Sequence, residues 1–115
     1  MIDYTEVFKE ISAIRKALRE PIKHMPKYDR YLVGDNIQKQ LLNIKVTVSL
    51  AYNYPDRFGY PDNALIRDLC VLATYLDECI EDNILEMHGY YNIIEPRRRL
   101  TKLIESIKLK TGDTH

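Results

Sequence analysis

The chain has 115 residues, of which 45% are hydrophobic and 30% charged, and its 17 Lys and Arg balance 17 Asp and Glu. This length suits one domain over residues 1–115, and the composition is too apolar for a disordered chain. The neutral balance excludes a global attraction to nucleic acid or to membranes. No apolar run approaches the roughly 20 residues that span a bilayer. The first residues also lack an apolar signal segment, so we expect a cytoplasmic protein without a membrane partner.

The first predicted helix runs from about Asp3 to His24, with charged residues opposite an apolar stripe. The stripe consists of Val7, Ile11, Ile14, Leu18, Ile22 and Met25. Pro21 lies late in this run, where an interior proline either kinks the helix or ends it near Glu20. A turn-rich stretch is expected from Met25 to Gly34.

The second predicted helix spans about Asp35 to Tyr54, with Asp35 as a plausible N-cap. Its core stripe is Ile37, Leu41, Ile44, Val48 and Ala51. Residues 44–54 also alternate as a half-buried strand would, but the sequence offers that strand no partner for its backbone groups. We therefore favour the helix.

A loop is expected from Pro55 to Asn63 because of its composition. The third helix is predicted from about Ala64 to Met87, with Gly89 in the position of a C-cap glycine. Its apolar stripe is Leu65, Leu69, Leu72, Leu76, Ile80, Ile84 and Met87. The fourth helix covers about residues 93–110, since Asn92 and Glu95 have capping-box spacing and Pro96 would fall in the first turn. It would bury Leu100, Leu103, Ile104 and Ile107.

Short connections between helices of similar length favour antiparallel neighbours. The predicted fold is therefore all-α: an up-down-up-down antiparallel four-helix bundle.

No catalytic or cofactor-binding pattern is visible, so we expect neither enzymatic activity nor a cofactor. The carboxylates of Asp77 with Glu81 and of Glu78 with Asp82 have i, i+4 spacing, but no other helix offers matching metal ligands. The three histidines, His24, His88 and His115, lie at helix ends or in the tail. Cys70 and Cys79 point to opposite faces of their helix, so they form neither an internal disulfide nor a zinc pair.

The distribution of charge along the chain indicates a candidate binding surface, which the net charge does not. The third predicted helix is mostly acidic and the fourth is mostly basic, with Arg97, Arg98 and Arg99 in its expected first turns. In an antiparallel bundle Lys23, Lys27 and Arg30 would lie at the same end, as would Tyr28, Tyr31, Tyr90 and Tyr91. Arginines that contact phosphates beside rings that stack on bases are typical of nucleic-acid binding. Two alternatives remain: a solvated basic cap closed by tyrosines, or arginines paired with the acidic helix of a neighbouring subunit.

The second helix carries a further apolar stripe of Leu42, Val46 and Leu50, and Lys45 is the only charge between Leu41 and Tyr54. A second apolar face generally indicates a partner, and self-association is the simplest one.

The stretch that enters the second helix reads Pro-Lys-x-x-Arg-aromatic-x-aliphatic-Gly-Asp-x-Ile, from Pro26 to Ile37. This pattern resembles the Avd-like four-helix-bundle family, and the resemblance extends in helix order from about Tyr4 to Lys110. The family includes the accessory variability proteins of diversity-generating retroelements and proteins encoded in 23S rRNA intervening sequences.

The resemblance implies a homopentamer that binds nucleic acid and a reverse transcriptase and serves mutagenic copying. Retroelement members tend to be basic and to carry a tryptophan near the end of helix four, whereas this chain is neutral and has none. The alternative is therefore a bundle of the intervening-sequence type, of unknown role, whose charges serve subunit contacts.

Overall fold

The computed structural model describes residues 2–58, 62–81 and 87–110, and of residues 87–92 it describes the backbone only. Its elements are α1 (Tyr4–Lys23), α2 (Lys27–Asp29), the π-helical turn η1 (Arg30–Gly34), α3 (Asp35–Asn53), α4 (Pro55–Phe58), α5 (Asp62–Glu81) and α6 (Met87–Lys110). No strand occurs within these described ranges. The prediction of an all-α chain is confirmed, and residues 44–53, which also fit a strand, lie in α3.

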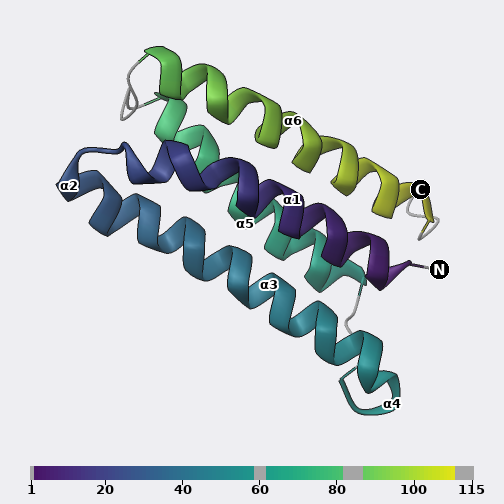
Figure 1. Ribbon diagram of the computed structural model, residues 1–115. Coiled ribbons are helices and arrows are strands. Elements are labelled where there is room, and N and C mark those ends of the chain that lie inside the picture. Colours follow the sequence, from purple (N-terminus) through teal and green to yellow (C-terminus); the bar gives the residue numbers. More distant parts are fainter. Residues whose placement is uncertain (1, 59–61, 82–86, 111–115) are drawn as a thin grey trace.

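The four long helices lie side by side, and successive ones run in alternating directions (Figure 1). Helix α1 packs against α3 and α6, and α5 packs against the same two helices. The space between them is filled by one apolar cluster to which all four contribute, including Ile11, Leu41, Leu69 and Leu100, whose side chains are completely buried. The predicted core stripes are confirmed for α1 and α3 throughout.

Helix α1 begins at the predicted place because Asp3 caps it. The Asp3 carboxylate accepts hydrogen bonds from the backbone N–H groups of Thr5 at 3.1 Å and Glu6 at 3.3 Å. The helix continues past Pro21 to Lys23, so it does not stop near Glu20. Beyond the proline, Ile22 and Met25 are both buried in the core, and this packing favours the last turn.

The predicted turn from Met25 to Gly34 is largely wrong, because α2 and η1 lead directly into α3. Asp35 has helical backbone angles, φ −64° and ψ −39°, so it is not an N-cap. Its N–H bonds to the carbonyl of Arg30, five residues earlier, as in a π-helical turn. A Cβ on Gly34 would lie 3.0 Å from Cγ2 of Ile22, so this glycine serves close packing rather than a turn.

The predicted loop after Tyr54 is also partly helical. Residues 55–58 form α4, whose first proline lacks only an N–H that a first turn leaves unpaired. The Tyr54 carbonyl accepts bonds from the N–H groups of Arg57 and Phe58. Helix α5 starts at Asp62, slightly earlier than expected, and residues 59–61 lie outside the described residues.

The predicted start of the fourth helix is wrong. Helix α6 begins at Met87, so Gly89 lies inside it and is not a C-cap, and Pro96 lies in its interior. Ile93 is completely buried and extends the apolar stripe of Leu100, Leu103 and Ile107 toward the N-terminus of the helix. Burial of this whole stripe, at about 1.5–3 kcal/mol for each side chain, outweighs the combined cost of about 4 kcal/mol for Gly89 and Pro96 in a helix. The predicted end of the third helix, residues 82–86, lies outside the described residues.

Candidate nucleic-acid interface

The three arginines of α6 do not lie at the end of the bundle. They follow Met87 by ten or more residues, which places them about 15 Å along the helix from its first residue. At this distance from the N-terminus their charges do not oppose the helix dipole, because that effect is confined to the first turn. The prediction that Arg97, Arg98 and Arg99 share one cap with Lys23, Lys27 and Arg30 is wrong.

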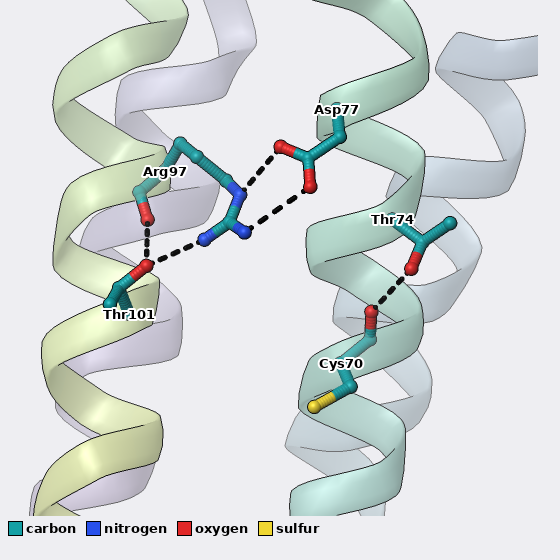
Figure 2. A network of polar contacts seen from close by, with 5 residues as sticks. All are labelled: Cys70, Thr74, Asp77, Arg97 and Thr101. Carbon is teal, nitrogen blue, oxygen red and sulfur yellow. Dashed lines mark hydrogen bonds and ion pairs between the residues drawn. The ribbon is translucent and has the colours of Figure 1, made fainter.

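Arg97 binds the acidic helix of its own chain (Figure 2). Its Nε lies 2.8 Å from Oδ1 of Asp77 and its second terminal nitrogen lies 3.2 Å from Oδ2, a bidentate pair between α6 and α5. The remaining terminal nitrogen donates to the hydroxyl of Thr101 at 2.6 Å. Arg97 is thus paired with Asp77 of α5 in its own chain, and this pair needs no neighbouring subunit.

Arg99 makes a similar pair with α1. Its Nε and a terminal nitrogen lie 3.3 Å and 3.0 Å from the two carboxylate oxygens of Glu10. This hydrogen bonding, followed by the negative charge of Glu10, raises the pKa of Arg99 above its ordinary value. Farther along, Nζ of Lys110 lies 3.1 Å from a carboxylate oxygen of Glu6. Helix α6 is thereby joined by charge to both of its neighbours.

Arg98 differs from the other two arginines. It projects into solvent and contacts only Glu95 among the described side chains, at 3.2 Å on the same helix. An exposed pair of this kind is weak and is screened by salt. Each of the three arginines therefore has a carboxylate partner, but only Arg98 is loosely held.

Lys23, Lys27 and Arg30 do lie at one end of the molecule, because α1 ends at Lys23, α2 begins at Lys27 and η1 begins at Arg30. Figure 1 shows this end of the helices. Lys23, Lys27 and Arg30 are all exposed, and a terminal nitrogen of Arg30 donates to the backbone carbonyl of Lys23 at 3.2 Å. Glu20 and Asp29 lie in the same stretch and offset much of the positive charge. This end is therefore a mixed-charge surface rather than a strongly basic one.

Two tyrosines stand out on this surface. Tyr28 and Tyr31 are 74% and 71% exposed, and they lie three residues apart on the helical path from α2 into η1. Side chains at this spacing share a face of a helix. The side chains of Tyr90 and Tyr91 lie outside the described residues. Within the described part, the structure brings Lys23, Lys27, Tyr28, Arg30 and Tyr31 together, and we call these five residues the α1–α2 end.

In the part of the chain that the structure describes, few other side chains could bind a metal or act as nucleophiles. No group of three or more His, Cys, Asp or Glu side chains that could hold a metal occurs there. Cys70 is exposed and Cys79 buried, and neither forms a disulfide within the described residues. Thr74 donates to the carbonyl of Cys70, a bond internal to α5 that leaves the thiol uninvolved (Figure 2). No described helix is both long and apolar enough to cross a bilayer.

The second apolar stripe of α3 is exposed in part: Leu42 and Val46 leave 52% and 50% of their surface in solvent, whereas Leu50 is half-buried. The sequence did not predict that Phe8 of α1 lies beside this stripe. Phe8 is also exposed there, and Nζ of Lys45 lies 4.9 Å from the centre of its ring, within the range of a cation–π contact. Phe8 falls between two core positions of α1, and only the packing of α1 on α3 joins it to this surface.

Comparisons with known proteins add no relative: no protein-family model, curated protein or solved structure matches this chain.

Proposed function

We propose that this chain is a non-enzymatic accessory protein of the Avd-like type, which binds nucleic acid as a homo-oligomer and works beside a reverse transcriptase. In this proposal the subunit is an up-down-up-down antiparallel four-helix bundle and the assembly is a homopentamer. Apart from the resemblance, one observation carries the proposal: at the α1–α2 end, two exposed tyrosines lie among three exposed cations.

The contacts of the arginines move the proposed binding surface away from α6. Arg97 and Arg99 would have to give up bidentate carboxylate partners before binding a phosphate. The cations of the α1–α2 end have no such carboxylate pair among the described side chains. Because nearby carboxylates offset their charge, phosphate contacts alone would be few. Stacking of bases on Tyr28 and Tyr31 would supply much of the affinity, and this favours single strands, whose base faces are accessible.

A second candidate is an oligomeric scaffold of unknown role, as in the intervening-sequence branch. It is favoured by the internal pairing of Arg97 and Arg99, which uses the basic helix to hold the fold together. In this case the α1–α2 end would have no affinity for nucleic acid.

The two candidates differ in the effect of substitutions at the α1–α2 end. We expect Tyr28→Ala with Tyr31→Ala to weaken binding to a single-stranded oligonucleotide by about 30-fold or more, since stacking contributes about 1–3 kcal/mol per base and two rings are removed. Tyr28→Phe with Tyr31→Phe is the matched control, because it keeps both rings. Fluorescence anisotropy with labelled single-stranded and duplex probes measures both effects.

The cations are tested by salt dependence. For single strands the slope of log K against log salt is about −0.7 per phosphate neutralised. Lys23→Gln, Lys27→Gln and Arg30→Gln together should flatten that slope, whereas Arg97→Gln with Arg99→Gln should leave it unchanged at constant helicity. No binding by the wild-type protein at low salt would contradict the proposal and favour the scaffold. A reverse transcriptase gene with template and variable repeats beside this gene would support it further.

A further inference from the structure

The outer side of α3 carries a row of apolar side chains spaced four residues apart. Leu42, Val46, Leu50 and Tyr54 form this row, which we call the α3 ridge. Tyr54 is 58% exposed, and Leu42 and Val46 are about half exposed. The corresponding outward positions of α6 are mostly charged, for example Glu95, Arg98, Lys102 and Glu105. An apolar outer row of this length is costly in water unless something covers it.

A groove runs beside the α3 ridge, where α1 and α3 meet. One section, of about 260 Å³, is lined by Tyr4, Thr5, Phe8, Val48, Ser49, Tyr52 and Asn53. A second section of about 280 Å³ continues it along Phe8, Leu42, Lys45, Val46, Ser49 and Leu50. Ridge and groove therefore belong to one continuous surface, which we call the α1–α3 face.

Some polar groups on this face already have partners within the chain. The Asn53 amide donates to the carbonyl of Ser49 at 3.0 Å and to the Ser49 hydroxyl at 3.3 Å. Lys45, the only charge of α3 beyond Leu41, lies over the ring of Phe8. Covering the face would leave these groups with their partners, which lowers the cost of burying them.

We infer that a second copy of this chain covers the α1–α3 face, with the α3 ridge of one subunit seated in the groove of the next. Helices pack by placing ridges into grooves, and rows spaced four residues apart make the commonest such ridge. Each subunit carries both a ridge and a groove, so the ridge of one copy can enter the groove of the next in a head-to-tail contact, the kind that closes a ring. A face with a single cation offers little to a phosphate backbone or to an anionic membrane surface.

The size of the face fits this occupant. Its exposed rings, Phe8, Tyr52 and Tyr54, leave roughly 300 Å² in solvent, taking about half of 150–250 Å² for each ring, and the half-exposed Leu42 and Val46 add to this area. A standard interface buries about 800 Å² on each partner, so the apolar part would form its centre and the polar margins its rim. This inference rests on the homo-oligomer of the proposed function and names the surface that forms it.

The test is the mass of the wild-type protein and of the variant Leu42→Glu/Val46→Glu, measured by light scattering after size exclusion. We expect the wild type to be an oligomer and the variant to be a monomer at the same concentration. Both substituted side chains are half in solvent, so circular dichroism should show unchanged helicity. Leu109→Glu is the matched control: Leu109 is 73% exposed on α6, a helix that contributes no side chain to the face, and its variant should keep the wild-type mass.

A monomeric wild type, or a double variant that keeps the wild-type mass, overturns the inference. A variant with reduced helicity is replaced by Leu42→Gln/Val46→Gln, which removes the apolar ridge without adding charge. Oligonucleotide binding is measured on the same samples. Loss of assembly in the variant supports the named face even if no sample binds nucleic acid, and in that case only the proposed function fails.

Discussion

Single side chains of α6 have two different roles. Arg97 and Arg99 reach across to α5 and α1, and their carboxylate partners hold them in fixed positions. Arg98, between them in sequence, points away from both neighbours and contacts only its own helix. Three adjacent arginines thus differ because successive residues of a helix point about 100° apart.

These contacts lead to a prediction about stability. Arg97→Gln should lower the free energy of unfolding by about 0.5–1 kcal/mol, since it removes a bidentate pair whose members are still partly solvated. Arg98→Gln, which removes only an exposed pair on one helix, should change it by less than about 0.5 kcal/mol. Urea denaturation of both variants measures the difference. A stabilised Arg97→Gln protein would contradict this prediction and mean that desolvation of the pair costs more than its attraction contributes.

Periodicity predicted where the apolar stripes lie, and the buried residues of α1 and α3 follow it closely. The positions of Gly, Pro and Asp, which commonly cap or break helices, predicted the ends of helices less well. Gly34, Asp35, Gly89 and Pro96 all lie inside helical segments. Local preferences of this kind amount to about 1 kcal/mol for glycine and about 3 kcal/mol for proline. Burial of side chains such as Ile93 outweighs them, and burial depends on tertiary packing that the sequence does not display.

The candidate site could also be predicted only in part, because some of its residues are brought into place by tertiary packing. Lys23, Lys27, Tyr28, Arg30 and Tyr31 are close in sequence, so any helical or turn structure keeps them near one another. The arginines of α6 were assigned to that end only because the helix was expected to start at residue 93. An earlier start by six residues moves them about 9 Å along the helix axis. Their pairing with Asp77 and Glu10 then follows from the packing of three helices.

The junction between α1 and α3 depends on Gly34. Alanine normally stabilises a helix by about 1 kcal/mol relative to glycine. Here its Cβ would meet the stiff β-branched side chain of Ile22 at 3.0 Å, and overpacking costs about 1–3 kcal/mol. We therefore expect Gly34→Ala to destabilise the protein by about 1 kcal/mol, measured by thermal or urea denaturation.

A double-mutant cycle separates this contact from other effects of the glycine. In an Ile22→Ala background the obstructing methyl group is gone, so Gly34→Ala should be neutral or should stabilise by up to about 1 kcal/mol. An equal loss of stability in both backgrounds would show that backbone conformation, not the approach to Ile22, requires glycine at this position.

At the scale of the whole molecule, charge and apolar surface are kept apart. Ion pairs join α6 to α1 and α5, whereas beyond Leu41 the only charged residue of α3 is Lys45. One side of the subunit is therefore built to face water and the other to be covered. The proposed ring or smaller assembly would place α3 at the subunit contacts and leave α6 outside them.

The packing of α1 against α6 also has a consequence for the order of events in folding. Glu10 and Arg99 lie 89 residues apart in sequence, and Glu6 and Lys110 lie 104 apart. Bringing such distant segments together closes nearly the whole chain into a loop, whose entropic cost precedes any gain from the contact. We expect these pairs to form after the transition state. Glu6→Gln with Glu10→Gln should then speed unfolding and leave the refolding rate unchanged in stopped-flow measurements. Slower refolding would instead place the meeting of the first and last helices at the rate-limiting step.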